Sequence, residues 1–235
     1  MTTLEGKTAI VTGASSGIGA KIAEELAAEG VKVLLAARSE DKLKDVVEKI
    51  ESKSMGKASY VVTDVSDLQS VTNLVKEAQK EFSQVDILIN NAGQMLTGTV
   101  RSGRVKEWER MIDVNIKGLL YCIDAVLPEM IDRSYGHIVN ISSVSGFEVT
   151  KNSTVYSATK SAVKMISAGL EKELARTGVR TTNISPGMVE TPLVAGSNWK
   201  GERKKLQTKD IVRAVIYALT QPDYVNVNEI TVRPV

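Results

Sequence analysis

The chain has 235 residues, of which 43% are hydrophobic and 25% are charged, so it can bury a sizeable core and has the composition of a globular protein. Its 30 basic and 28 acidic residues give a net charge of +2, which predicts neither a nucleic-acid surface nor a membrane surface. The single cysteine, Cys122, excludes an internal disulfide, and the single histidine, His137, argues against a His-based triad or a His-rich metal site.

The first predicted element is a strand over residues 7–12, which form an apolar run rich in β-branched side chains. It leads directly into a turn that contains Gly13, Gly17 and Gly19, and then into a helix with apolar residues at helical spacing. Glycines let a backbone approach a pyrophosphate closely, and the start of a helix adds unpaired N–H groups and a partial positive charge. This order of strand, turn and helix predicts a dinucleotide site.

The end of the second predicted strand, residues 31–37, bears on the choice of dinucleotide. An acid about 20 positions past the glycines binds the ribose 2′-OH of NAD, whereas a nearby arginine suits the 2′-phosphate of NADP. Here the strand ends at Ala37 and Arg38, and no acid occurs before Glu40. Because arginine pairs bidentately with phosphate, the sequence favours NADP(H).

Strand-like and helix-like segments alternate along the rest of the chain. We expect helices at residues 41–53, 67–82, 106–131, 156–177 and 210–220, and strands at residues 58–63, 85–90, 137–142, 179–185 and 228–232. This alternation predicts a single α/β domain with a doubly wound parallel sheet of about seven strands and helices on both faces. Residues 189–208 form one long irregular stretch, which we predict to be a lid over the substrate.

Tyr156 and Lys160 stand four residues apart in the helix expected over residues 156–177, and Ser143 follows the strand expected at 137–142. A helix places positions i and i+4 on one face, so the phenol and the ammonium can converge. A free tyrosine has a pKa of about 10, and a nearby lysine charge lowers the pKa of a phenol. The hydroxyl of Ser143 is then placed to polarise a carbonyl oxygen. By itself, this spacing also occurs on ordinary surface helices.

Together, these segments resemble the short-chain dehydrogenase/reductase family over essentially the whole chain. The resemblance rests on motifs that occur in the order and at the spacing of the family: Thr12 to Gly19, Asp64 and Val65, residues 90–93, Asn115, Ser143, Tyr156 with Lys160, Pro186 with Gly187, and Thr191. Residues 225–235 are similar to the NADP-dependent serine/3-hydroxy acid dehydrogenase branch. The resemblance implies a Rossmann fold and hydride transfer between a nicotinamide and a small carbonyl or secondary alcohol.

The resemblance also implies roles for individual residues. Tyr156 is the expected general acid/base, Lys160 lowers its pKa, Ser143 rather than Ser142 orients the substrate oxygen, and Asn115 kinks its helix and holds a water. The implied cofactor-binding residues are Gly13, Ser15, Ser16, Gly17, Ile18, Gly19, Arg38, Ser39, Asp64, Val65, Asn91, Ala92, Gly93, Tyr156, Lys160, Pro186, Gly187, Val189 and Thr191. The implied substrate-binding residues are Met95, Ser145, Phe147 and Met188.

We therefore expect an NADP(H)-dependent oxidoreductase of small molecules, with a 3-hydroxy acid as one substrate class. Two alternatives stay open: a reductase of uncharged ketones, diketones or aldehydes, and a non-catalytic NADP-binding regulatory protein. No signal-peptide pattern and no stretch near ~18 apolar residues occurs, so we expect a cytoplasmic protein without a membrane partner. Family resemblance implies a homotetramer, without metal or nucleic acid. Lys200, Arg203 or Lys204 is expected to contact an acidic substrate, unless these residues form a solvated basic surface.

Overall fold

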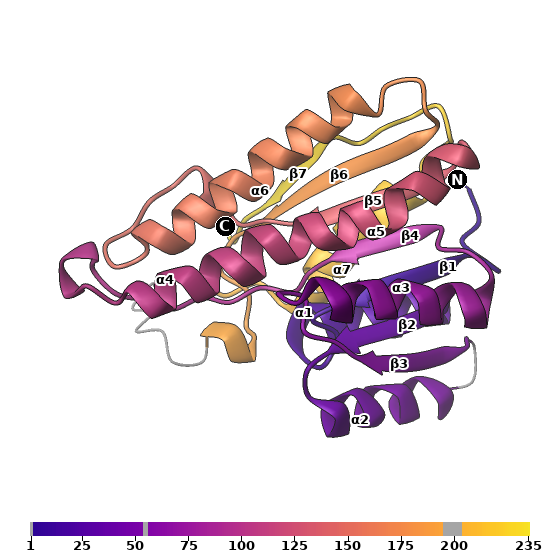
Figure 1. Cartoon of the computed structure of the whole chain (residues 1–235), viewed down its shortest axis with the longest axis horizontal. Helices are drawn as coiled ribbons and strands as arrows, with labels where there is room; N and C mark the ends of the chain where they lie inside the picture. The colour runs from indigo at the N-terminus through magenta and orange to yellow at the C-terminus, as the bar shows by residue number, and fades with distance from the viewer. Residues whose placement is uncertain (1, 54–55, 195–203) are drawn as a thin grey trace.

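The computed structural model describes residues 2–53, 56–194 and 204–235, and its centre is a seven-stranded parallel sheet (Figure 1). The strand order is β3-β2-β1-β4-β5-β6-β7, and every neighbouring pair is parallel. The strands are β1 (Thr8–Thr12), β2 (Lys32–Ala37), β3 (Ala58–Val62), β4 (Ile87–Asn90), β5 (Gly136–Ile141), β6 (Val179–Pro186) and β7 (Glu229–Val232). The predicted α/β fold with a doubly wound parallel sheet is confirmed.

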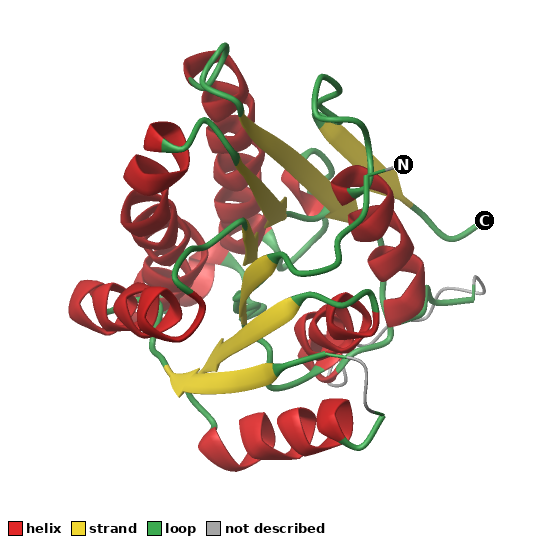
Figure 2. Ribbon diagram, turned by 90° about the vertical axis from the view of Figure 1, so that its right-hand side faces the viewer, coloured by secondary structure: helices red, strands yellow, loops and turns green. Residues whose placement is uncertain are grey.

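Helices cover both faces of this sheet (Figure 2). One face is covered by α1 (Gly17–Ala28), α2 (Glu40–Glu51) and α7 (Thr208–Leu219), and the other by α3 (Leu68–Phe82), α5 (Gly118–Asp132) and α6 (Thr154–Glu173). Successive residues of a strand point to opposite faces, so in β1 Val11 packs with the first layer and Ile10 with the second. Both faces are buried, which explains why the central strands are apolar at almost every position.

The helical region expected at residues 106–131 is present, but a π-helical turn lies within it. It consists of α4 (Val105–Ile112), a π-helical turn η2 (Asp113–Lys117) and then α5. The helix predicted over residues 156–177 ends earlier than expected, because α6 ends at Glu173 and Arg176 adopts a positive φ of 70°. The other predicted helices and strands are present, with ends that differ by a few residues.

The carboxyl ends of the strands meet at one edge of the sheet, and the strand order reverses between β1 and β4. In open parallel sheets, ligands bind in the crevice at such a switch point. Thr12 joins the two strand ends here: its Oγ1 accepts from the backbone N–H groups of Asn91 and Ala92, each at 3.0 Å. The sheet therefore presents the loops after β1 and β4 as one surface.

The irregular stretch predicted at residues 189–208 is described only at its two ends. Val189 and Leu206 form a parallel β-bridge, in which the Leu206 N–H donates to the Met188 carbonyl at 2.9 Å. Between them, Pro192–Val194 form a short 3-10 helix. Lys200 and Arg203 lie outside the described residues, and Lys204 is exposed, so the lid and its basic contact remain predictions.

Within the described part of the chain, no helix is both long and apolar enough to span a bilayer. The same residues contain no group of three or more histidine, cysteine, aspartate or glutamate side chains placed to hold a metal ion.

Candidate active site

The glycine turn after β1 leaves no room for side chains. Gly13 and Gly17 have positive φ values of 64° and 60°, which residues other than glycine rarely adopt. A Cβ atom at Gly13 would lie 2.9 Å from the Cα of Ala92, and one at Gly19 would collide with Asn91 and with the Gly13 carbonyl. The start of α1 is thus packed directly against the loop that follows β4, and its backbone stays open to a ligand.

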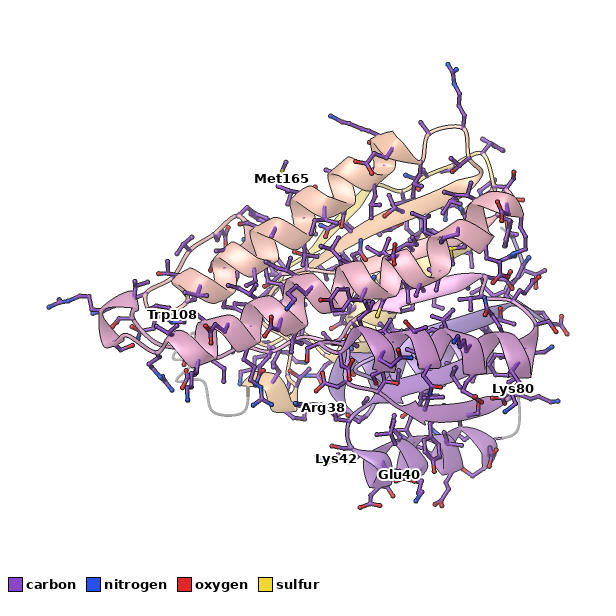
Figure 3. The ribbon with its side chains drawn as sticks, viewed as in Figure 1. Arg38, Glu40, Lys42, Lys80, Trp108 and Met165 are labelled. Atoms are coloured by element: carbon purple, nitrogen blue, oxygen red, sulfur yellow. The ribbon has the colours of Figure 1, made fainter. Side chains whose placement is uncertain are left out.

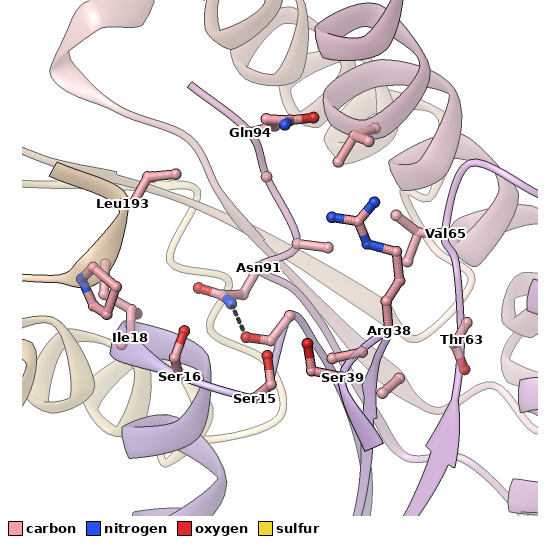
Figure 4. A pocket seen from close by; sticks show the side chains of 18 of the residues that line it. Ser15, Ser16, Ile18, Arg38, Ser39, Thr63, Val65, Asn91, Gln94 and Leu193 are labelled. Atoms are coloured by element: carbon pink, nitrogen blue, oxygen red, sulfur yellow. Dashed lines mark hydrogen bonds between the residues drawn. The ribbon is translucent and has the colours of Figure 1, made fainter. Parts of the chain in front are cut away.

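Asn91 holds the turn and this loop together. Its Nδ2 donates to the Thr12 carbonyl at 2.9 Å and to the Gly13 carbonyl at 3.3 Å (Figure 4). Helix α1 has no acidic residue in its first turn, and its N-cap Ser16 makes no side-chain capping bond. An anion at this helix start would therefore meet no competing carboxylate from the helix itself.

A pocket of about 420 Å³ opens beside the glycine turn (Figure 4). Its lining includes thirteen of the predicted cofactor-binding residues: Gly13, Ser15, Ser16, Gly17, Ile18, Arg38, Ser39, Asp64, Val65, Asn91, Ala92, Gly93 and Thr191. It also includes seven residues that were not among the predicted cofactor-binding residues: Ala36, Ala37, Thr63, Gln94, Val114, Pro192 and Leu193. Several of these seven residues stand at the end of a strand or next to a motif residue. This position is the one signal in the sequence that could have indicated them.

Six predicted cofactor residues lie outside this lining: Tyr156 and Lys160, which are described below, and four others. Gly19 packs against Asn91, and the Gly187 N–H donates to the Val232 carbonyl at 2.7 Å. Val189 lies in the hydrophobic core, where its exposed fraction is 4%. Pro186 ends β6 and is buried beside it. Through these positions the four residues support the pocket wall rather than form its surface.

One end of the pocket carries the Arg38 side chain, which follows β2 and projects toward Val65 (Figure 4). Asp64 lies opposite, after β3. Burial raises the pKa of Asp64, but hydrogen bonds from Ser66 and the charges of Arg38 and Arg110 outweigh it, and the net pKa is lowered. A glycine turn that a phosphate can approach, with a cation at the end of β2, fits a nicotinamide dinucleotide.

Beyond the other end of the pocket lie Ser143, Tyr156 and Lys160. Ser143 is the N-cap of a 3-10 helix after β5, and its hydroxyl is near enough to Tyr156 to lower the pKa of that phenol. Tyr156 and Lys160 are both buried on α6. The Lys160 Nζ lies 3.5 Å from where a Cβ would stand on Gly93, a residue of the pocket lining. These three side chains therefore gather next to the pocket. Ser142 does not join them, because its hydroxyl donates to the Lys160 carbonyl at 2.9 Å.

Burial sets the acid–base properties of Tyr156 and Lys160. It raises the pKa of Tyr156 to about 12, an effect that the nearby Ser143 hydroxyl only partly offsets. It lowers the pKa of Lys160 to about 8. The expected lowering of the Tyr156 pKa by the Lys160 charge stays a prediction, because burial dominates the shift in the chain itself. The Lys160 Nζ donates to the Ile141 carbonyl at 2.9 Å. Tyr156 is consequently a protonated phenol at neutral pH.

Asn115 lies in the middle of the π-helical turn and is buried. Its Oδ1 accepts from the Gln94 N–H at 2.7 Å, and its Nδ2 donates to the Gln94 carbonyl at 2.9 Å and to Thr159 Oγ1 at 3.0 Å. Asn115 thus ties the loop after β4 to α6, next to Lys160. The helix is interrupted at this residue, as the resemblance implied, whereas a bound water stays a prediction.

The predicted substrate-binding residues are less uniform. Met95 and Met188 are half-buried beside the pocket loops. Ser145 is held by its backbone, whose N–H donates to Ser143 Oγ at 3.1 Å. Phe147 is 43% exposed, and its ring is flanked by the Lys164 Nζ at 4.7 Å and by the Arg233 guanidinium at 5.3 Å. The two cations come from segments far apart in the sequence and hold the ring in place. The sequence could not indicate this contact.

Comparison with known proteins gives a consistent result. The model of the short chain dehydrogenase family matches residues 7–201. An uncharacterized oxidoreductase of Staphylococcus saprophyticus is 57% identical over 235 residues, which is 100% of each chain. The closed form of serine dehydrogenase complexed with NADP+ has a TM-score of 0.87 and 32% identity, over 96% of this chain and 94% of that one. An alcohol dehydrogenase from the archaeon Thermococcus sibiricus, complexed with 5-hydroxy-NADP, has a TM-score of 0.88 and 29% identity, over 97% of each chain.

Proposed function

The chain belongs to the short-chain dehydrogenase family of nicotinamide-dependent oxidoreductases, and from its site we propose that it prefers NADP(H) and interconverts a small carbonyl compound and the corresponding secondary alcohol. A 3-hydroxy acid is the leading substrate class, because the serine dehydrogenase is among the structures that this chain resembles. Uncharged ketones, diketones and aldehydes are the second class.

The proposed preference for NADP(H) rests on the end of β2. Arg38 lines the pocket and Ala37 stands beside it, so no carboxylate there would accept a ribose hydroxyl or repel a phosphate. Two of the similar solved structures hold NADP+ or an NADP derivative, which supports the same choice.

The proposed chemistry assigns one task to each side chain beside the pocket. The nicotinamide supplies or accepts the hydride. Tyr156, protonated at neutral pH, donates its phenolic proton to the substrate oxygen as that oxygen gains negative charge. Ser143, whose hydroxyl is near Tyr156, orients the same oxygen. Lys160 places a cation close to the pocket lining and stabilises the phenolate that remains.

The observation that carries this proposal is the convergence of Ser143, Tyr156 and Lys160 beside the pocket that begins at the glycine turn. The catalytic members come from β5 and α6, and the glycines come from β1 and α1, so only the folded chain brings them together. A protein that merely binds the cofactor has no need for a buried phenol and a buried ammonium at this position, since burying an ammonium costs free energy.

The proposal is tested by following absorbance at 340 nm with NADPH and with NADH across keto acids, keto esters, diketones and aldehydes. Tyr156→Phe should lower turnover of the best substrate by at least about 100-fold, because it removes the proton donor. NADPH binding, measured by fluorescence titration, should stay nearly the same. Tyr224→Phe removes an equivalent hydroxyl from an exposed tyrosine and should leave both measurements unchanged. A Tyr156→Phe enzyme that keeps a tenth of wild-type turnover would show that another acid acts.

A further inference from the structure

A second cavity of about 520 Å³ adjoins the first beyond Arg38. It is lined by Arg38, Asp64, Ser66, Lys106, Glu109, Arg110, Asp113 and Val114. Arg38, Asp64 and Val114 also line the first pocket, so the two cavities form one continuous groove. The outer part of this groove has no role in the chemistry proposed above.

Helix α4 and the π-helical turn form the far wall of this outer part. Lys106, Arg110, Asp113 and Val114 follow one another at positions i, i+4, i+7 and i+8, which places them on one helical face, with Glu109 at its margin. The opposite face is held in the protein by Met111, which is fully buried. Arg110 therefore reaches the groove from α4, whereas Arg38 reaches it from the end of β2.

The cations of the groove are not neutralised by ion pairs. Within the described part of the chain, no carboxylate lies within 4 Å of the charged atoms of Arg38, Lys106 or Arg110, although Asp113 is paired with Lys117 at 2.8 Å. Arg38 and Arg110 both lie near Asp64. Burial raises the pKa of Asp64, whereas the hydrogen bonds from Ser66 and the charges of Arg38 and Arg110 lower it. The glycine turn itself contains no basic residue.

We propose that Arg110 is a specificity-determining residue that binds the 2′-phosphate of NADP(H) from α4, opposite Arg38. This inference rests on the proposed preference for NADP(H). A phosphate monoester carries a charge of about −1.5 to −2 at neutral pH and has three acceptor oxygens, enough for two guanidinium groups. Each guanidinium donates in a planar fork that matches phosphate. Asp64 and Glu109 line the same groove and oppose the binding of an anion, so binding of the phosphate requires both guanidinium groups.

Isothermal titration with two probes, 2′,5′-ADP and 5′-AMP, tests this inference without any turnover. The wild-type protein should bind 2′,5′-ADP more tightly than 5′-AMP. Arg110→Gln should weaken 2′,5′-ADP roughly tenfold, the effect expected for loss of a charged hydrogen-bond donor, and should change 5′-AMP by less than about twofold. Arg213→Gln removes the same charge from the exposed face of α7, outside both cavities, and should change neither affinity.

A second variant, expected to change the affinity in the opposite direction, separates an electrostatic role of Arg110 from a structural one. Glu109→Gln removes the negative charge one residue from Arg110 and should tighten 2′,5′-ADP about two- to threefold, with little change for 5′-AMP. Equal weakening of both probes by Arg110→Gln, or no effect of either variant on 2′,5′-ADP, would overturn the role of Arg110. A wild-type protein that binds the two probes equally would overturn both this role and the proposed preference for NADP(H).

Discussion

Burial, more than charge, sets the pKa values of three buried side chains, those of Tyr156, Lys160 and His137. It moves the pKa of Tyr156 up to about 12, of Lys160 down to about 8 and of His137 down to about 3, each time in favour of the neutral form. A sequence shows which groups can titrate and how they are spaced, but not how much solvent each retains. The proximity of Ser143, Tyr156 and Lys160 could therefore be predicted from the sequence, whereas the direction of the shift in the Tyr156 pKa could not.

His137 offers a direct test at this scale, because it is the single histidine of the chain. It is buried in β5, its Nε2 lies 2.8 Å from Thr182 Oγ1, and Arg180 stands opposite it in the register of β6. Desolvation first, and the Arg180 charge second, lower its pKa to about 3. We predict that its imidazole NMR resonances do not titrate between pH 8 and pH 5 in the folded protein, whereas in concentrated urea they titrate near pH 6.5.

The same shift has a consequence for stability. Between pH 6.5 and about 3 the unfolded chain binds a proton at His137 that the folded chain does not, so this group destabilises the protein progressively as the pH falls through that window. A folded-state titration midpoint near pH 6.5 would show that His137 is solvated and would remove this contribution.

At the scale of elements, apolar patterns predicted the buried strands well, because both faces of a parallel sheet demand apolar residues. They did not reveal the π-helical turn at Asp113–Lys117, since an i→i+5 turn leaves almost the same pattern as an α-helix. They also missed Thr63, Gln94 and Val114 of the pocket lining. These residues belong to loops and turns that become neighbours only through the order of the strands, and periodicity within a segment carries no information on that order.

The segment that carries Ser143 is pressed against α6 at Gly146. A Cβ at Gly146 would lie 2.9 Å from the Lys160 carbonyl oxygen and 3.0 Å from its carbon, both of which are backbone atoms. We predict that Gly146→Ala pushes this segment away from α6, costs about 1–3 kcal/mol of stability and lowers kcat further than the loss of folded protein explains. Thermal melting and kcat of the folded fraction measure the two effects.

Gly169→Ala is the matched control on the same helix. No heavy atom lies within 4 Å of its added Cβ in the described structure, and alanine is the better helix former, so stability should rise by up to about 1 kcal/mol with kcat unchanged. If Gly146→Ala behaves in the same way as Gly169→Ala, the contact with Lys160 does not position Ser143.

The whole molecule exposes apolar side chains on the layer that contains α5 and α6. Leu120 and Ile131 of α5 are 42% and 39% exposed, and Met165 of α6 is 68% exposed and projects outward (Figure 3). Exposed apolar groups that gather on one face mark interaction surfaces, and assemblies of identical chains usually close by symmetry. With the resemblance noted above, this surface favours the homotetramer that we expected.

We predict that light scattering at micromolar concentration gives the mass of four chains, and that Met165→Glu shifts the mass to smaller species, because a charge would be buried in the interface. Val62→Glu, on the edge strand β3 at a residue that is 48% exposed, should leave the mass unchanged. A wild-type protein that scatters as a monomer would contradict the assembly.

The β-bridge between Val189 and Leu206 has an evolutionary consequence. It clamps both ends of the intervening segment, with the Glu190 N–H donating to the Leu206 carbonyl at 2.8 Å and the Gln207 side chain donating to Glu190 at 2.9 Å. Once its ends are joined, a loop can lengthen at a cost of only about 0.6 kcal/mol for each doubling of its length. Insertions between these anchors thus need not displace Thr191 or α7, so descendants of this chain can change the length of this segment while they inherit the pocket beside the glycine turn unchanged.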